Sequence, residues 1–175
     1  MAKLRKMLGD VNAPVTVALM QLIETQSGTT LAGWALSFVE ENVLPIYAKA
    51  YPDDITVRQA IDAAKGYVAG EVTLKDVKAQ IKIVNQIARD TADTPVAQAA
   101  VRAIATACAV TYSPTGALGY TFYAAAAIVY DKVGVQEKPA VYDELAAKEF
   151  DNLLASLQAV AVADEPNPVK VNWNC

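Results

Sequence analysis

The stretch from Val96 to Tyr130 restricts the fold of this chain more than any other feature. Its 35 residues are almost entirely apolar and carry a single charge, on Arg102. Pro114 and Gly116 divide the stretch into two segments, each shorter than the roughly 20 apolar residues that a membrane-spanning helix needs. Both segments are rich in alanine and apolar on all sides, a pattern typical of helices enclosed by other helices. We therefore expect no membrane insertion and two alanine-rich helices, one on each side of Pro114, at the centre of the fold.

Helix start and stop signals recur along the rest of the chain, whereas strand signals are few. A proline in the first turn marks helix starts at Pro14, Pro95 and Pro139. Pro45 is expected to break or kink another helix after Val43. The expected helices cover about residues 15–25, 31–43, 46–50, 56–69, 74–88, 95–111, 116–132 and 139–160. If the broken helix is counted once, these segments predict an all-α fold, a compact bundle of about seven helices.

Capping residues precede several of these helices. The expected caps are Asn12, Thr29 or Thr30, the pair Asp53 and Asp54, Thr73, and Asp93 or Thr94. Thr73 and Asp76 approximate a capping box. The apolar residues that follow them have helical spacing, at Leu74, Val77, Ile81, Val84 and Ala88. This pattern predicts an amphipathic helix with one buried face.

A change in composition near residue 164 divides the chain into two parts. Residues 1–163 are expected to form a single helical domain. Residues 164–175 contain Pro166 and Pro168, which a helix cannot accommodate in its interior. We expect this C-terminal tail to lie extended on the surface, pinned by Trp173.

The charge balance limits the kinds of partner that suit the protein. The formal net charge is −4, whereas proteins that grip nucleic-acid backbones carry clustered basic surface. Lys75, Lys78, Lys82 and Arg89 follow one side of an expected helix, but this is the side opposite the apolar seam, and a solvated face is the simpler interpretation. We expect no nucleic-acid partner, and a basic protein fits the charge better.

The N-terminal residues and the cysteines both favour a cytoplasmic location. Lys3, Arg5 and Lys6 interrupt the first nine residues, so the pattern of a secretory signal peptide is absent there. Cys108 lies in an apolar segment and Cys175 is the last residue. A buried thiol and a free tail thiol are the expected states, and a disulfide between them is the alternative.

The absence of histidine excludes most enzyme mechanisms that helical bundles support. Serine and cysteine triads, histidine-based zinc sites and di-iron sites with a Glu-x-x-His pair all require it. No calcium-binding loop and no phosphate-binding glycine loop is present either. We therefore predict a protein that is not an enzyme, with no catalytic residues, no cofactor and no metal site.

Arg58 and Arg102 are the most informative basic residues. Arg102 lies among alanines on an expected central helix, and a buried arginine must be paired because an isolated internal charge is costly. Glu40, Asp62 and Asp131 are candidate partners. The two arginines therefore predict either an internal ion pair that fixes helix register or an anion-binding pocket.

Acidic and aromatic residues gather around the kink at Pro45. This candidate partner-binding surface consists of Glu40, Glu41, Tyr47, Tyr51, Asp53 and Asp54. Aromatic side chains anchor protein interfaces, and acidic groups steer a basic partner towards them. The alternative is that the acidic residues serve as helix caps and solvated turns.

Several segments resemble a family of bacterial immunity proteins of the Imm5-like type, found in polymorphic toxin systems. The resemblance covers about residues 30–133. It is carried by LAGWALSFVEENVLPIY at 31–47, YPDD at 51–54, RQAIDAA at 58–64, YVAGEV at 67–72, AAVRAIATA at 99–107 and ALGY at 117–120. The resemblance implies an all-helical fold and the neutralisation of a toxin delivered between competing bacteria. It names no catalytic residues.

Three functional hypotheses follow. The first is a cytoplasmic immunity protein that binds and neutralises a cognate toxin through an acidic surface. The second is a helical enzyme or small-ligand carrier that uses an arginine-lined pocket. The third is a self-associating structural protein, because the tyrosines of the central helices could support a homo-oligomer; these are Tyr112, Tyr120, Tyr123 and Tyr130.

Overall fold

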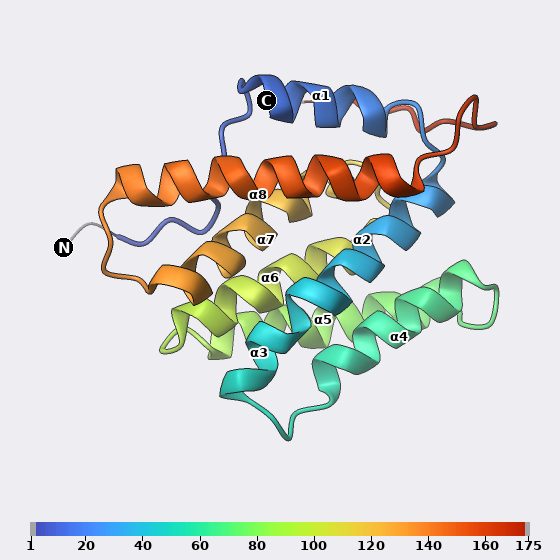
Figure 1. Ribbon diagram of the computed structural model, residues 1–175. Helices are drawn as coiled ribbons and strands as arrows, with labels where there is room; N and C mark the ends of the chain where they lie inside the picture. Colours follow the sequence, from blue (N-terminus) through green and yellow to red (C-terminus); the bar gives the residue numbers. More distant parts are fainter. Residues whose placement is uncertain (1–2, 174–175) are drawn as a thin grey trace.

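The computed structural model describes residues 3–173 and consists of eight α-helices (Figure 1). Their bounds are α1 Pro14–Ile23, α2 Gly28–Asn42, α3 Leu44–Ala50, α4 Thr56–Val68, α5 Leu74–Asp90, α6 Pro95–Ala109, α7 Gly116–Val133 and α8 Pro139–Val160. No β-strand occurs among the described residues, so the all-α prediction is confirmed. Only Val43 separates α2 from α3, and Pro45 lies in the first turn of α3, as expected for a helix broken by proline.

The helices α6 and α7 are enclosed by the others. α6 contacts α2, α3, α4, α5 and α7, and α7 also contacts α1 and α8. Neighbours on most sides account for the apolar composition of both helices, since little of their surface is left to water. Small side chains let the two backbones approach: a Cβ added to Gly116 of α7 would lie 3.3 Å from the carbonyl oxygen of Thr106 in α6.

The amphipathic pattern of α5 is realised in the structure. Val77, Ile81, Val84 and Ala88 are buried, whereas the lysines of the same helix are exposed. The Thr73 hydroxyl accepts a hydrogen bond of 3.2 Å from the backbone N–H of Asp76, as the capping signal predicts.

Two other expected caps differ in the structure. α2 begins earlier than expected and is capped by Ser27, whose Oγ accepts from the N–H of Thr30. Neither Thr29 nor Thr30 is the cap, because the residues ahead of them already adopt helical geometry. Asn12 does not cap α1 either, since Ala13 occupies that position without a side-chain hydrogen bond.

The segment before α1 packs against α7 and α8. Leu8 is buried, and its N–H donates a 3.1 Å hydrogen bond to the carbonyl oxygen of Phe122 in α7. Gly9 follows with a φ of +129°, a conformation that L side chains rarely adopt. Because Gly9 has no Cβ, the chain can turn here in close contact with the rings of Phe122 and Phe150.

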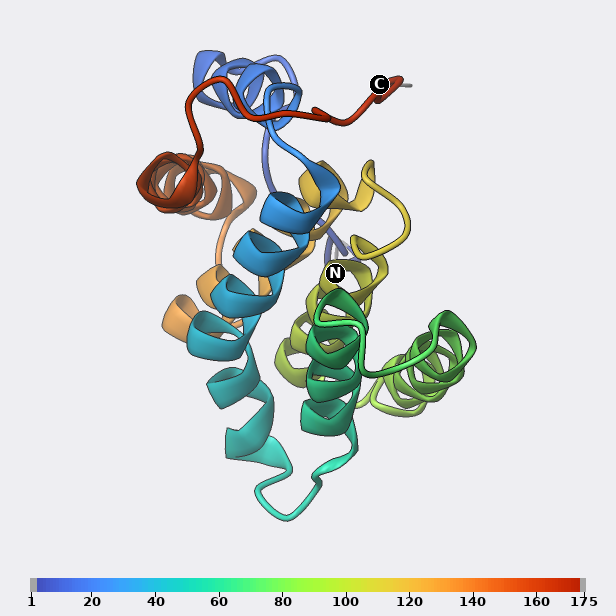
Figure 2. The same ribbon diagram turned by 90° about the vertical axis from the view of Figure 1, so that its right-hand side faces the viewer.

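The C-terminal tail runs back across the turn between α1 and α2 (Figure 2). The N–H of Val169 donates to the carbonyl oxygen of Gln26 at 2.8 Å, and Ser27 and Pro168 form an isolated bridge. The indole N–H of Trp173 donates to a carboxylate oxygen of Glu24. Residues 164–173 form no helix, turn at Asp164 and Asn167, where φ is positive, and are fastened to the helical body at several points.

Glu165 links this tail to the start of α2. Its carboxylate accepts hydrogen bonds from the N–H of Ser27 at 2.9 Å, from the Ser27 hydroxyl at 2.7 Å and from the Thr30 hydroxyl. The hydrogen bond from Thr30 and those from Ser27 lower the pKa of the Glu165 carboxyl below its usual value. A carboxylate at a helix N-terminus also interacts favourably with the helix dipole.

Replacing Glu165 with glutamine is expected to lower stability at neutral pH. Because the folded-state pKa of Glu165 lies below its unfolded value, its contribution is complete above about pH 4.3, the ordinary value for glutamate, and is lost as the pH falls through the folded pKa. The difference in unfolding free energy between wild type and Glu165→Gln should therefore shrink with acidification. Denaturant unfolding at a series of pH values measures it, with the exposed Glu71→Gln as the control. A difference that does not depend on pH would contradict the proposed role of the carboxylate.

The tyrosines and cysteines of the central helices occupy different environments. Tyr120 is completely buried, and its hydroxyl has no hydrogen-bond partner within the described structure. Tyr130 is also buried, but its hydroxyl donates to the carbonyl oxygen of Arg5 at 2.7 Å. Cys108 is fully buried, and burial raises the pKa of its thiol to about 12. This thiol therefore stays protonated, as expected for a core cysteine; Cys175 lies outside the described residues.

Candidate functional site

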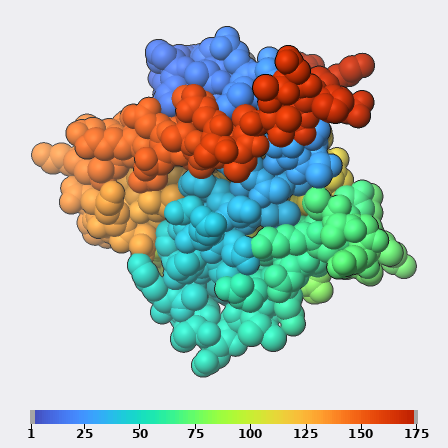
Figure 3. Space-filling model, turned by 45° about the vertical axis from the view of Figure 1, so that its right-hand side comes forward, coloured from blue at the N-terminus to red at the C-terminus, as the bar shows by residue number. Residues whose placement is uncertain are grey.

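A groove with a volume of about 680 Å³ lies between α2 and α8. Figure 3 shows the face on which α8, in orange to red, lies beside α2, in blue. The two helices cross near the C-terminal end of α8 and diverge from there, so that a wedge opens between them. We call this wedge the α2–α8 groove.

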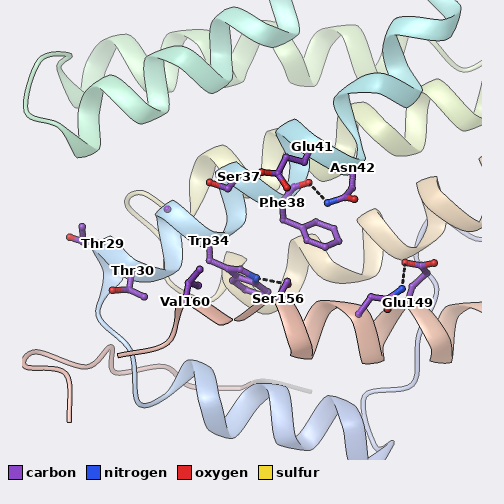
Figure 4. Close-up of a pocket in the computed structure, with 12 residues that line it drawn as sticks. Thr29, Thr30, Trp34, Ser37, Phe38, Glu41, Asn42, Glu149, Ser156 and Val160 are labelled. Atoms are coloured by element: carbon purple, nitrogen blue, oxygen red, sulfur yellow. Dashed lines mark hydrogen bonds between the residues drawn. The ribbon is translucent and has the colours of Figure 1, made fainter. Parts of the chain in front are cut away.

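Residues one or two turns apart on α2 line one side of the groove, since helical spacing brings them to the same face. They include Thr30, Trp34, Ser37, Phe38, Glu41 and Asn42, and α8 supplies Glu149, Asn152, Ser156 and Val160 (Figure 4). The indole N–H of Trp34 donates a 2.8 Å hydrogen bond to the hydroxyl of Ser156 and so joins the two sides. The groove is thus built from helix surfaces that are fixed to each other.

Aromatic rings form the bottom of the groove. Trp34 and Phe38 pack edge-on against Tyr120 of α7, with ring centroids 5.1 and 6.2 Å apart. Only 4% of Trp34 and 8% of Phe38 is exposed. Rings held in this way give a rigid apolar base, which is the kind of surface on which a partner side chain packs with little loss of entropy.

Two carboxylates line the groove without a cation beside them. Glu41 is exposed on α2, whereas Glu149 on α8 is only 9% exposed. The one hydrogen bond of the Glu149 side chain is long, 3.4 Å from the amide nitrogen of Asn152. Among the ion pairs of the described residues, none includes Glu41 or Glu149. The Glu149 carboxylate faces the groove, so a cation placed there could form an ion pair with it.

The other acidic residues expected at the partner surface are already engaged. Glu40 forms ion pairs with Lys65 and with Arg58. One carboxylate oxygen of Asp54 accepts a 2.5 Å hydrogen bond from the Tyr47 hydroxyl, and the other accepts from the N–H of Thr56 at the start of α4. The Asp54 carboxylate therefore bonds to the first turn of α4, although Ile55 occupies the N-cap position of that helix.

The pKa values of Asp54 and Tyr47 reflect this contact. Burial alone would raise the pKa of Asp54, but the hydrogen bonds from Tyr47 and Thr56 lower it below its usual value. Desolvation by burial raises the pKa of Tyr47, and the neighbouring Asp54 raises it further. Both groups therefore keep their usual neutral-pH states, with a neutral phenol donating to an ionised carboxylate.

The two tyrosines of the expected surface do not present free rings. Tyr47 is 2% exposed and belongs to the core. Tyr51 is partly buried, stacks on Tyr47 with a centroid distance of 5.1 Å, and shares a 2.9 Å hydrogen bond with the Thr94 hydroxyl. Asp53 is exposed in the turn after α3. Of the six predicted residues, only Glu41 lines the α2–α8 groove.

The structure separates the two arginines that the sequence singles out. Arg58 lies on the surface of α4, with its side chain 55% exposed, and pairs with Glu40 at 3.5 Å. Arg102 is partly buried on α6, and no ion pair within residues 3–173 involves it. Of the carboxylates expected near Arg102, Glu40 pairs with α4 and Asp131 pairs with Lys49 at 2.8 Å. Arg102 lines two adjoining hollows beside α6, and Arg58 lines neither of them.

Sequence reasoning missed the α8 side of the groove. Glu149, Asn152 and Ser156 lie one turn apart on α8, but they alternate with the apolar residues that pack this helix. The only signal was a charged residue, Glu149, directly beside Phe150 on the buried side. Such a residue is recognisable as unusual only once the buried side of α8 is known.

The described residues carry no sign of two other kinds of site. No group of three or more potential metal-ligating side chains occurs between residues 3 and 173. In the same part of the chain, no helix combines the length and the apolar character needed to cross a membrane.

Comparison with known proteins places the chain in a family. No curated protein and no solved structure matches it. A family model described as Imm-5 like putative immunity protein matches residues 21–156, which include α2 to α7 and most of α8. Because this match covers more than half of the chain, the protein belongs to the Imm-5 like putative immunity protein family.

Proposed function

We propose that this protein binds a cognate bacterial toxin and neutralises it by direct contact, and that the α2–α8 groove receives a cationic side chain of the toxin. Membership of the immunity family supports the general role. The observation that carries the specific proposal is the pair of carboxylates, Glu41 and Glu149, beside an aromatic base and without a cation.

Burial gives the two carboxylates different roles. Glu149 is 9% exposed, so an arginine or lysine that reaches it leaves water and forms a strong ion pair. Glu41 stands at the exposed rim of the groove, where its charge is screened and acts mainly on the encounter. The net charge of −4 adds to the attraction of a basic partner.

The aromatic base supplies the apolar part of the contact. A lysine or arginine side chain carries a long aliphatic stem, which packs on Trp34 and Phe38 while its charged head reaches Glu149. The hydrogen bond from Trp34 to Ser156 keeps the two sides of the groove at a fixed separation. The site therefore needs little rearrangement on binding, which favours affinity.

Co-expression with the toxin encoded by the neighbouring gene tests this function. We expect wild-type protein to restore growth and to co-purify with the toxin as a stable complex. Glu149→Gln should restore growth less well, whereas Asp151→Asn, an exposed position of α8 outside the groove, should behave as wild type. Growth arrest that persists with wild-type protein, without a complex, would refute the proposed function.

A further inference from the structure

A second groove lies between α5, α6 and the N-terminal segment, and it is basic. It has a volume of about 320 Å³, and three cationic residues line it: Lys6, Arg89 and Arg102. A smaller hollow of about 200 Å³ adjoins it and shares Lys6 and Arg102 while adding Lys3 and Arg5. We call the larger one the basic groove. It has no lining residue in common with the α2–α8 groove.

No carboxylate offsets the charge of the basic groove. Its lining contains neither aspartate nor glutamate, and none of its three cations belongs to an ion pair within the described residues. Five other cationic side chains do pair with carboxylates on α2, α7 or α8, and these are Arg5, Lys49, Arg58, Lys65 and Lys148. Like charges brought together on one concave surface repel each other, and a bound anion removes that repulsion.

The helices hold the side chains of the basic groove in place. Gln98, Arg102 and Thr106 are one turn apart on α6 and share a face. The Gln98 amide donates a 2.7 Å hydrogen bond to the carbonyl oxygen of Ala88 in α5, so the two helices that form the groove are joined. On the α5 side, Arg89 is held by hydrogen bonds from its guanidinium to the Gln86 side chain.

The groove also offers uncharged contacts. Asn85 of α5, Thr106 of α6 and Tyr123 of α7 complete its lining. The Thr106 hydroxyl donates to the carbonyl oxygen of Arg102 and can still accept a hydrogen bond. Tyr123 is partly buried and presents an aromatic wall. The space is larger than a lone anion requires, so it has room for a group attached to that anion.

We propose that the basic groove binds the phosphate group of a small molecule. Two planar guanidinium groups present forks of N–H donors that match phosphate oxygens, and Lys6 adds a point charge. Inorganic phosphate and a nucleoside monophosphate share this chemistry. The proposal concerns the isolated protein and does not depend on the toxin or on the α2–α8 groove.

Calorimetric titration of the purified full-length protein tests this site. Inorganic phosphate and adenosine monophosphate are the two probes, at low ionic strength. We expect saturable binding of at least one probe, and a dissociation constant that rises by about tenfold or more in Arg102→Gln, because a charged hydrogen bond is lost. Tighter binding of the nucleotide would identify the attached group as part of the ligand, and equal binding would identify phosphate alone.

Two further variants keep the result interpretable. Arg89→Gln changes an exposed residue and should weaken binding even if Arg102→Gln proves unstable. Lys75→Gln removes a charge from α5 outside the groove and should bind as wild type. Binding of neither probe by wild-type protein, or equal binding by all variants, would overturn the proposal.

Discussion

Replacing Gly9 with alanine is expected to lower the free energy of unfolding by about 3 kcal/mol, from two separate costs. The φ of +129° at this position is strained for any residue with a Cβ. The added Cβ would also lie 2.5 Å from Cε2 of Phe150 and 2.9 Å from Cδ1 of Phe122. Neither ring can yield easily, because the two rings pack on each other at 5.1 Å and Phe150 is 1% exposed.

Denaturant unfolding of alanine variants at two other glycines separates the backbone strain from the clash of the added Cβ. Gly70 has a φ of +78° and open space around it, so Gly70→Ala should cost only about 1 kcal/mol of backbone strain. Gly33 lies within α2 with open space, so Gly33→Ala should be neutral or stabilise by up to about 1 kcal/mol. If Gly9→Ala costs no more than Gly70→Ala, the N-terminal segment does not pack on α7 and α8 as described.

Replacing Glu149 with glutamine is expected to weaken toxin binding by about 30-fold or more. Removing one member of a buried, hydrogen-bonded charge pair costs about 2–5 kcal/mol, much of it because the other charge is left buried and unpaired. The same change removes a negative charge that forms only one long hydrogen bond and no ion pair in the free protein. Glu149→Gln should therefore fold at least as well as wild type while binding more weakly. Titration of each variant, labelled with a fluorophore, with purified toxin measures the dissociation constant of the complex.

The position of each carboxylate provides the controls for this measurement. Glu41→Gln, at the exposed rim, should weaken the binding free energy by only about 0.2–1 kcal/mol. Its main effect should be a lower association rate with the toxin at low salt. Asp151→Asn lies on α8 outside the groove and should have no effect. If Glu149→Gln and Asp151→Asn lowered the affinity for the toxin equally, the net charge and not the groove would govern the affinity.

Much of the fold could be predicted from the chain because its helix signals are local. Proline in the first turn marked the starts at Pro14, Pro95 and Pro139, and Pro45 marked the break between α2 and α3. The start of α2 was placed too late, because Ser27 is selected as the cap partly by contacts with Glu165, far along the chain. Tertiary contacts of this kind leave no local pattern.

The candidate site was less predictable, for a related reason. Helical spacing shows which residues of one helix share a face, but it does not show which helices become neighbours. Tyr47 and Asp54 were proposed as part of a surface, whereas they form a contact between α3 and the start of α4. Glu41 and Glu149 become members of one groove only because α2 and α8 cross.

The charges of Arg58 and Arg102 illustrate the same limit. Their residue types predicted either an ion pair or an anion site. The structure gives Arg58 the partner Glu40, and it places Arg102 beside Lys6 and Arg89. Which of the two alternatives applies to each arginine depends on the charges of residues distant in sequence.

The most direct test of the α2–α8 groove is a fluorine NMR spectrum of the complex. The chain has two tryptophans, and 5-fluorotryptophan at both positions gives one signal from the groove, Trp34, and one from the tail, Trp173. The variant Trp173→Phe assigns them, and an unlabelled toxin contributes no signal. We predict that the Trp34 resonance shifts on complex formation while the Trp173 resonance does not. A complex in which the Trp34 resonance stays unchanged would contradict binding at this groove.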